Sequence, residues 1–327
     1  MGFIGLQATP PLFSQWRRPE ADIMLLTSVK PSTASFVAAL AEHNTFRAQA
    51  LSNPGVHEVR VWKDVCPPSL KRSMGLLFGL QHTPEDTDPE RLVEMAAAGV
   101  RTLALAYHGH TRFGSGFAAG WGGLTPSGEE LIEAMAELGI LLDISHANEE
   151  TALDALNFID RRGLKMLPMA SHSGCYAIHP HKRNATNDML ANLAVVDGYC
   201  GLPLLSFYLT PKSQYEQGWE LFCEHVKTAI RYCGLNRVGI GSDCNHIDMD
   251  PVEAEEHFKR MLELTRMKPD DEMGPYYPDR LDGTVAGGSK LFSIIRRQLQ
   301  THGFKEGVIS KICGENFRSY LQRALPA

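Results

Sequence analysis

Short apolar runs alternate with longer amphipathic stretches along most of the chain, and this alternation constrains the fold more than any other feature. Several runs are apolar on both faces, such as ILLDIS at 140–145, which is typical of parallel strands covered by helices. The run HEVRV at 57–61 is more polar and suits an edge or a loop. The runs that we interpret as strands are 3–8, 75–80, 101–107, 140–145, 166–171, 199–207 and 237–242.

The stretches between these runs carry helix signals. One stretch begins at Thr125, offers Ser127 and Glu130 as a capping box and ends at Gly139. Asn148 is placed to cap the following helix. Repeated strand–helix units without a break in composition favour an α/β fold, a (β/α)8 TIM-type barrel. We expect one such domain over residues 1–327, and a doubly wound sheet is the second choice, because no Gly-x-Gly-x-x-Gly follows a strand.

Composition excludes several classes of protein. The 327 residues are 43% hydrophobic and 21% charged, and the net charge of −6 is spread without long runs, so we expect no nucleic-acid partner and no binding to an anionic membrane. No apolar run reaches the roughly 18 residues of a membrane span. The N-terminus lacks the pattern of a signal peptide, and the seven cysteines are scattered, which favours reduced thiols in a cytoplasmic protein.

Polar side chains follow the predicted strands at the points where the strands end. In a barrel these positions open onto one face and carry the chemistry. Two histidines on neighbouring strands can share one metal ion through their imidazole nitrogens, and a nearby aspartate can move protons. The residues at these positions are Gln81, Tyr107, His108, His146, His172 and Asp243.

Other polar residues have weaker claims to the site. A single histidine at a strand end is more often a hydrogen-bonded core residue than a ligand. His179 and His181 are expected in a solvated loop, whereas His110 and His246 could reach the pocket. Arg183 follows the His172 strand and could bind a carboxylate with two hydrogen bonds, although alone it reads as a surface arginine.

Four segments together carry a resemblance to a known family. They are GLTPSGEELIEAMAELGILLDISH, MASHSGCYAIHPHKRNATNDML, RVGIGSDCNH and VISKICGENFRSYLQRAL. Their order and spacing resemble the membrane dipeptidase (renal dipeptidase) family of zinc peptidases, from about Gly75 to the C-terminus. Members of that family are (β/α)8 hydrolases that cleave dipeptides at a paired-zinc centre.

The resemblance implies roles for individual residues. His146 and His172 match two ligands of one zinc ion, and Arg183 matches the arginine that receives the C-terminal carboxylate of the substrate. Asp243 matches the aspartate that handles the proton during turnover. Residues that match positions near the reacting group or the substrate are Tyr107 or His108, and Tyr208.

The chain also departs from the family pattern. No Asp-x-His-x-Asp precedes Gly75, and MGFIGLQAT at 1–9 resembles the second barrel strand. A (β/α)8 barrel has eight strands and we predict seven, so we expect the missing strand to be the first. Gln81 stands where the family has a metal-bridging glutamate. Two divalent ions about 3.5–4 Å apart repel by roughly 20 kcal/mol at an effective dielectric near 20. Carboxylate ligands normally offset this repulsion, and the chain lacks both the Asp-x-His-x-Asp motif and the bridging glutamate. We therefore expect at most one zinc ion, held by Gln81, His146 and His172.

Three hypotheses follow for function. The first is a hydrolase of the dipeptidase family that cleaves a dipeptide or a small amide with a free carboxylate at a single-metal site. The second is a metal-independent enzyme acting on an amino-acid-like substrate in a biosynthetic pathway. The third is a non-catalytic homologue that binds a ligand or a partner.

The N-terminal region raises a separate question. If Met1 is an internal start, the missing strand is encoded upstream. Otherwise an N-terminal segment, the loop at 268–283 or the second subunit of a homodimer is expected to cover the open edge of the barrel.

Overall fold

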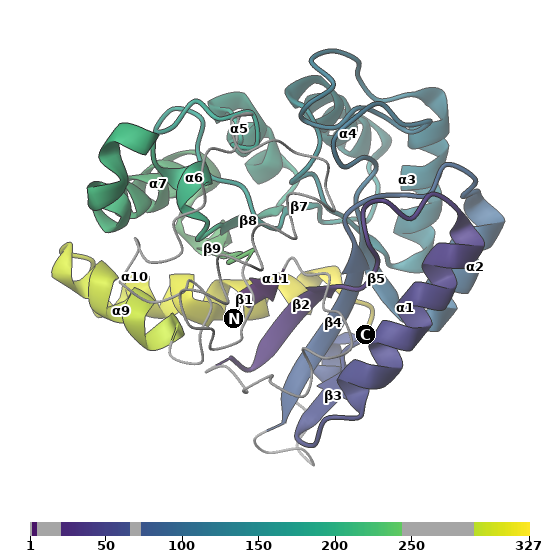
Figure 1. The fold of residues 1–327 in the computed structure, drawn as a ribbon, viewed down its shortest axis with the longest axis horizontal. Coiled ribbons are helices and arrows are strands. Elements are labelled where there is room, and N and C mark those ends of the chain that lie inside the picture. Colours follow the sequence, from purple (N-terminus) through teal and green to yellow (C-terminus); the bar gives the residue numbers. More distant parts are fainter. Residues whose placement is uncertain (1, 5–20, 66–72, 244–290) are drawn as a thin grey trace.

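Parallel strands form the centre of the protein (Figure 1). The computed structural model describes residues 2–4, 21–65, 73–243 and 291–327. The strands follow one another in the orders β1-β2-β4-β5-β6 and β7-β8-β9, and a parallel bridge between Asp143 and Met169 joins the two sets. Eight strands of the described residues lie on this path: β1 (Gly2–Ile4), β2 (Ile23–Thr27), β4 (Met74–Leu80), β5 (Val100–Leu103), β6 (Leu141–Leu142), β7 (Met169–Ala170), β8 (Tyr199–Leu202) and β9 (Val238–Ile240).

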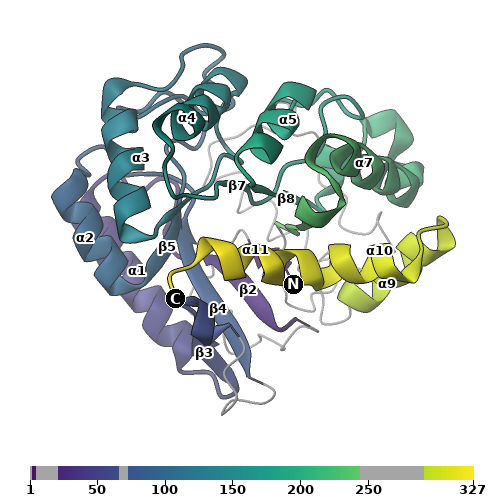
Figure 2. The ribbon, with the colours of Figure 1, turned by 180° about the vertical axis from the view of Figure 1, so that it is seen from behind.

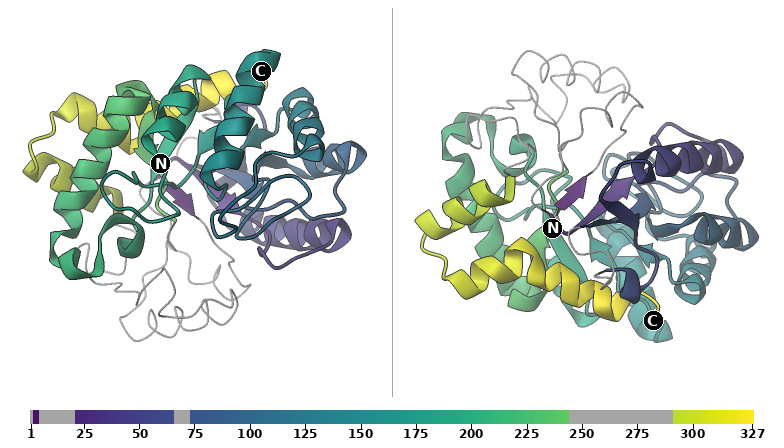
Figure 3. Two further views of the ribbon diagram at one scale, coloured as in Figure 1. Left: turned by 90° about the horizontal axis from the view of Figure 1, so that it is seen from above. Right: turned by 90° about the horizontal axis from the view of Figure 1, so that it is seen from below.

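Helices surround these strands, as the views from above and below show (Figure 3). Most of them connect one parallel strand to the next, which is the arrangement of the predicted (β/α)8 barrel. The helices of the described residues are α1 (Phe36–Leu51), α2 (Pro89–Ala98), α3 (Pro126–Leu138), α4 (Glu149–Arg162), α5 (Asn187–Val195), α6 (Ser206–Leu209), α7 (Gly218–Cys233), α9 (Leu291–Thr301), α10 (Glu306–Ser310) and α11 (Asn316–Ala324).

The strand prediction needs two corrections. The count of seven is one short because β2 was not recognised as a strand, although its five residues are all buried. β1 lies first in the order and β2 lies between β1 and β4, so the segment beginning at Gly2 is not the second strand. Residues 5–8 of the predicted first strand and the loop at 268–283 lie outside the described residues.

Most observed strands are shorter than the predicted runs. The run at 199–207 ends at Leu202, and α6 begins at Ser206. Backbone pairing nevertheless continues beyond some strand ends, because the N–H of Ala104 donates to Leu80 O at 3.0 Å. The polar run at 57–61 corresponds to β3 (Val56–Glu58), which pairs with the beginning of β4 outside the main path.

One helix prediction is confirmed in its bounds, a second is confirmed in its N-cap, and one cap is corrected. α3 ends at Gly139, which has a left-handed φ of 66° that favours glycine. The side chain of Asn148 caps α4 by accepting from the N–H of Thr151. The predicted Ser127 capping box is wrong, because the hydroxyl of Thr125 accepts from Gly128 N and makes Thr125 the N-cap of α3.

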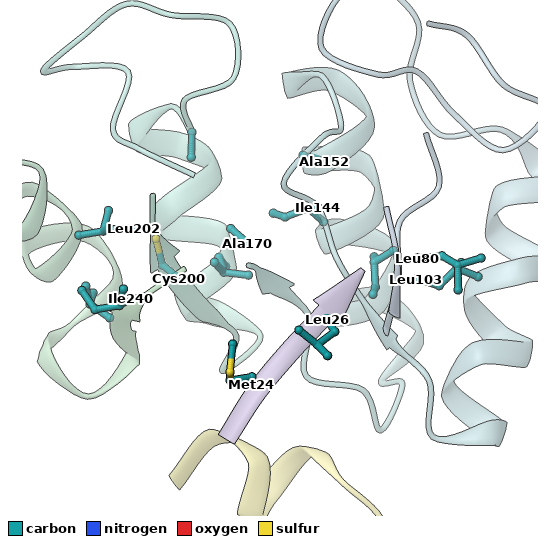
Figure 4. Close-up of a cluster of buried hydrophobic side chains, with 14 of the residues drawn as sticks. Met24, Leu26, Leu80, Leu103, Ile144, Ala152, Ala170, Cys200, Leu202 and Ile240 are labelled. Carbon is teal, nitrogen blue, oxygen red and sulfur yellow. The ribbon is translucent and has the colours of Figure 1, made fainter. Parts of the chain in front are cut away.

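Alternate residues of several strands, β2 and β4 among them, face two different cores. Phe78 of β4 faces outward, since its ring makes edge contacts with Phe46 and His43 of α1. Figure 4 shows other members of this outer cluster, including Met24 and Leu26 of β2. The residues of opposite parity form a second cluster in the interior of the barrel. Its strand members are Ile23, Leu25, Leu77, Leu141, Met169 and Tyr199.

α11 closes the interior cluster at the amino ends of the strands, and Figure 2 shows this helix lying across them. Phe317 and Tyr320 pack against Tyr199, the first residue of β8. The Tyr320 hydroxyl donates to the carbonyl of Leu167 at 2.5 Å. An apolar plug therefore fills this end of the barrel, and the polar residues lie at the carboxyl ends of the strands.

Candidate active site

Two buried imidazoles meet at the carboxyl ends of β6 and β7. His146 and His172 are 3% and 1% exposed, and their Nε2 atoms lie 3.0 Å apart. Burial and the nearby Arg183 guanidinium hold the pKa of each imidazole well below its usual range. Both rings are therefore neutral at physiological pH, which is the state in which an imidazole nitrogen can bind a metal ion or accept a proton.

Arg183 approaches this pair from the loop after β7. The residue is 3% exposed, and its Nη2 lies 3.3 Å from His146 Nε2. Its guanidinium lies over the rings of Phe117 and Tyr208, at 5.4 and 5.3 Å from their centroids. Its Nε and Nη1 atoms have no hydrogen-bond partner among the described residues. A buried cation with unpartnered donors is suited to receive an anionic group of a ligand.

Asp243 lies beside His172 at the end of β9. One carboxylate oxygen is 3.9 Å from His172 Nε2. Burial raises the pKa of the Asp243 carboxyl to about 7, against the opposing effect of Arg183. The backbone of Asp243 is left-handed, with φ of 52°, a conformation that aspartate tolerates better than most residues. Such a carboxyl can take up and release a proton near neutral pH.

A glycine brings the ends of β9 and β7 together. A Cβ atom at Gly241 would overlap the carbonyl oxygen of Ser171, so this close approach requires glycine. Ser171 and Gly241 directly precede the segments that carry His172 and Asp243. The glycine in the run VGIGS therefore helps to place the carboxylate beside the imidazole.

The remaining predicted residues surround the two imidazoles. Tyr107 stacks on His146 with ring centroids 4.0 Å apart and an interplanar angle of 22°. Burial raises the pKa of the Tyr107 phenol far above its usual range, so it stays protonated. Burial lowers the pKa of His108 to about 4, and its Nε2 has no hydrogen-bond partner among the described residues. The side-chain amide nitrogen of Gln81, Nε2, lies 3.4 Å from His172 Nε2.

Several weaker candidates do not join this cluster. His110 is exposed and contacts Ser115 and Trp121 instead. His181 was expected to be solvated, but it is 6% exposed because its ring packs on Tyr208. His246 lies outside the described residues.

Three buried polar residues next to His172 were not predicted as part of the site from the sequence. Asp143, Ser145 and Ser171 lie directly beneath His172, and each is 3% exposed. Asp143 accepts hydrogen bonds from both serines, and the hydroxyl of Ser171 contacts His172 Nδ1 at 2.7 Å. The carboxylate inside the otherwise apolar run ILLDIS could have indicated this network, because a charged residue rarely lies in a barrel interior without hydrogen-bond partners.

The two imidazole nitrogens of the site are spaced so that they could hold a zinc ion. Two imidazoles bound to a tetrahedral zinc at about 2.0–2.1 Å have nitrogens about 3.3 Å apart, close to the 3.0 Å between His146 and His172. The amide nitrogen of Gln81 faces His172 Nε2, and rotation of the amide by half a turn would present its oxygen as a third, weak ligand. The described part of the chain contains no group of three or more His, Cys, Asp or Glu side chains that could hold a metal ion.

Comparisons with known proteins agree with this fold. A sequence model of the family described as membrane dipeptidase (peptidase family M19) matches residues 19–267. Dipeptidase aclJ of Aspergillus oryzae is 28% identical over 164 residues, which are 49% of this chain and 38% of that protein. The chain thus spans well under half of the length of this curated relative.

Solved structures share the architecture of the whole chain. An amidohydrolase from Pseudomonas aeruginosa superposes with a TM-score of 0.79 at 20% identity, covering 99% of this chain and 95% of that one. A metallo peptidase from Rhodobacter sphaeroides, liganded with a phosphinate mimic of the dipeptide L-Ala-D-Ala, superposes with a TM-score of 0.70 at 20% identity. It covers 93% of this chain and 87% of that one. These likenesses confirm the predicted barrel fold. None of the helices in the described ranges has the length and apolar character needed to cross a bilayer.

Proposed function

Because the chain belongs to the membrane dipeptidase family, we propose that it is a hydrolase that cleaves a dipeptide or a small amide with a free carboxylate, using one zinc ion. The observation that carries this proposal is the 3.0 Å approach of His146 Nε2 to His172 Nε2, with Arg183 and Asp243 on either side. A metal-binding pair, an anion-binding cation and a proton-transfer group are the three parts that such a hydrolysis needs.

Each residue has a separate task in the proposed reaction. His146, His172 and the amide of Gln81 would hold the zinc ion, which supplies an activated water and polarises the amide carbonyl when bound. Arg183 binds the carboxylate of the substrate through Nε and Nη1, which are unpartnered in the described residues. Asp243 accepts a proton at its carboxylate and returns it to the leaving amine, for which a pKa of about 7 is suitable.

The aromatic residues support these groups. Tyr107 holds the ring of His146 by stacking on it, and Phe117 and Tyr208 cover the guanidinium of Arg183. These rings exclude water from the cation, and a charge-assisted hydrogen bond is stronger where water is excluded. His108 and Tyr107 lie where they can contact the carbonyl oxygen of a bound substrate as it becomes charged, and the protonated phenol of Tyr107 can donate to it.

A zinc titration tests the proposed function. The purified protein is stripped with a chelator, and the turnover of a set of dipeptides is measured while zinc is added back. Activity should appear with added zinc and saturate at one equivalent. Variants His146→Ala and His172→Ala should have no activity, whereas His110→Ala, which changes an exposed histidine outside the cluster, should retain it. No turnover of any dipeptide at any zinc concentration would contradict the proposal.

A metal-independent reaction is the second candidate, and one observation favours it. The guanidinium of Arg183 lies 3.3 Å from His146 Nε2, so a cation already occupies the vicinity of the nitrogen that would bind zinc. In this version His146 and His172 act as acid and base toward an amino-acid-like substrate. A third version, in which the chain binds a ligand without catalysis, predicts carboxylate binding through Arg183 and no turnover. Activity that persists with less than about a tenth of an equivalent of metal would select the second candidate.

Three further predictions concern the molecule in the cell. We propose that residues 1–327 form one domain, that the protein is cytoplasmic and that it forms a homodimer. Limited proteolysis, cell fractionation and light scattering test these three proposals in turn.

A further inference from the structure

A buried carboxylate supports the imidazole of His172 from inside the barrel. We propose that Asp143 is a positioning residue that, acting through Ser171, determines which ring nitrogen of His172 carries hydrogen. The proposal deepens the function given above and rests on it, because it concerns a histidine of the same site. It assigns a role to a network that neither the metal ligands nor the substrate-binding residues explain.

Asp143 is surrounded by four hydrogen-bond donors. Its Oδ1 accepts from the backbone N–H groups of Ser145 and Ser171, at 3.0 and 3.1 Å, and from the Ser145 hydroxyl at 2.6 Å. Its Oδ2 accepts from the Ser171 hydroxyl in a short contact. A carboxylate has acceptors only, so the Ser171 hydroxyl donates to Oδ2. The Ser145 hydroxyl also lies 3.0 Å from Ser171 Oγ, so it can donate either to Asp143 Oδ1 or to that oxygen, and Ser171 Oγ accepts in the second case.

The orientation of the Ser171 hydroxyl then determines the state of His172. A serine has a single hydroxyl hydrogen, and Ser171 uses it on Asp143. Its oxygen can therefore only accept at the 2.7 Å contact with His172 Nδ1, so Nδ1 carries the hydrogen. In the neutral ring, Nε2 then carries the lone pair. That nitrogen faces the site, 3.0 Å from His146 Nε2 and 3.4 Å from the amide of Gln81.

This state is the one that the site requires. An imidazole with a lone pair on Nε2 can bind a metal ion or accept a proton, whereas one with hydrogen on Nε2 can do neither at that atom. Ser145 adds to the restraint, because its hydroxyl oxygen accepts from the backbone N–H of His172 at 3.0 Å. The network therefore fixes both the backbone and the ring of His172.

The substitution Asp143→Asn should reverse the hydrogen-bond chain. The two backbone N–H groups at Oδ1 cannot turn around, so they hold the oxygen of the introduced amide at that position. The amide nitrogen then takes the place of Oδ2 and donates to Ser171 Oγ. With its oxygen accepting from the amide, the Ser171 hydroxyl can donate to His172 Nδ1, which moves the ring hydrogen to Nε2.

Nitrogen NMR of the ring distinguishes the two states in the metal-free protein. The protein is labelled with ¹⁵N-histidine, and the His172 signals are assigned by their loss in His172→Gln. We expect Nδ1 of the wild type to give the signal of a protonated nitrogen and Nε2 that of an unprotonated one, and Asp143→Asn to exchange the two. The control Asp154→Asn, which changes an exposed carboxylate that accepts from Leu124 N, should leave both signals in place. The same His172 state in the wild type and in Asp143→Asn overturns the proposal.

A second variant covers the case in which Asp143→Asn does not fold. Ser171→Ala removes the hydroxyl between Asp143 and His172, so both ring states should become populated, whereas Ser171→Thr retains the hydroxyl and should keep the wild-type state. An unchanged ring state in Ser171→Ala overturns the proposal as well.

Zinc affinity gives an independent measurement. Loss of a partner behind a metal-bound histidine typically weakens binding by roughly 10- to 100-fold, and we expect a weakening in that range for Asp143→Asn. Unchanged affinity contradicts the positioning role. A wild-type protein that binds no zinc contradicts the proposed function instead, and the ring-nitrogen signals still decide the role of Asp143.

Discussion

At the level of single residues, the charge of Arg183 opposes the zinc ion that the two histidines would hold. Its Nη2 lies 3.3 Å from His146 Nε2, whereas the Asp243 carboxyl, which is only partly ionised near neutral pH, lies 3.9 Å from His172 Nε2. A divalent ion about 4 Å from a unit positive charge is repelled by roughly 8 kcal/mol at an effective dielectric near 20. The carboxylate of a substrate bound to Arg183 would offset this repulsion. Bound substrate should therefore raise the affinity for zinc, and bound zinc should raise the affinity for substrate.

Removal of the Arg183 charge should tighten zinc binding and abolish substrate binding. We expect Arg183→Met to lower the Kd for zinc at least about tenfold, which corresponds to only 1.4 kcal/mol of the repulsion. The same variant should show no saturation by dipeptide. Isothermal titration calorimetry measures both effects, and Arg183→Lys, which keeps the charge, should bind zinc like the wild type. Equal zinc affinity in Arg183→Met and the wild type would show that the guanidinium does not act on the metal site.

The sequence identified the residues that the barrel brings together but not the contacts beneath them. The position of His146 and His172 after two apolar runs was sufficient to predict their approach, because parallel strands end on one face. Asp143 was not predicted, since in ILLDIS it reads as one polar residue of a strand. Its role depends on the Ser171 hydroxyl, which lies 28 residues away in the chain and contacts it only in the folded protein.

Among the elements, α7 is joined to its neighbours through one buried histidine. His225 Nδ1 accepts from the backbone N–H of Cys175 at 2.8 Å, and its Nε2 donates to the carbonyl of Leu209 in α6 at 2.9 Å. Burial lowers the pKa of His225 to about 4. The ring is therefore neutral in the folded protein at pH values where it is charged in the unfolded chain, whose histidines titrate near 6.5.

This difference predicts acid sensitivity between pH 6.5 and 4. In that range the unfolded chain binds more protons at His225 than the folded protein, so the stability contributed above pH 6.5 is lost as the pH falls toward 4. The loss from this residue amounts to roughly 3 kcal/mol. Urea unfolding at a series of pH values should show a shallower decline for His225→Gln than for the wild type. Parallel declines would mean that His225 does not titrate as described.

α11 provides a test of the closed end of the barrel. Tyr320→Phe removes the hydrogen bond to Leu167 O and leaves that carbonyl unpaired, so the free energy of unfolding should fall by about 1–2 kcal/mol. The site lies at the opposite ends of the strands, so zinc affinity should not change. Tyr176→Phe, at a residue 43% exposed, is the matched control and should have no effect on stability. A loss of zinc affinity in Tyr320→Phe would show that the two ends are coupled.

In the molecule as a whole, the barrel has an apolar half and a polar half. Ile23, Leu77 and the α11 rings fill the amino ends of the strands, and Gln81 and Asp143 continue the interior toward the carboxyl ends. The alternation of apolar and amphipathic stretches predicts this architecture, because eight buried parallel strands need helices on the outside. It does not predict β2, because a short apolar run of this kind is also found in buried helices and loops. It does not predict the exact strand ends either, because these depend on pairing with neighbouring strands.

The number of zinc ions bound per chain tests the proposed site most directly. Metal analysis after dialysis against zinc should give one equivalent for the wild type and less than a tenth of an equivalent for His146→Ala and His172→Ala. Two equivalents would mean that residues outside the described cluster complete a paired centre. No zinc in the wild type, or one equivalent that both substitutions leave in place, would contradict a single ion held between His146 and His172.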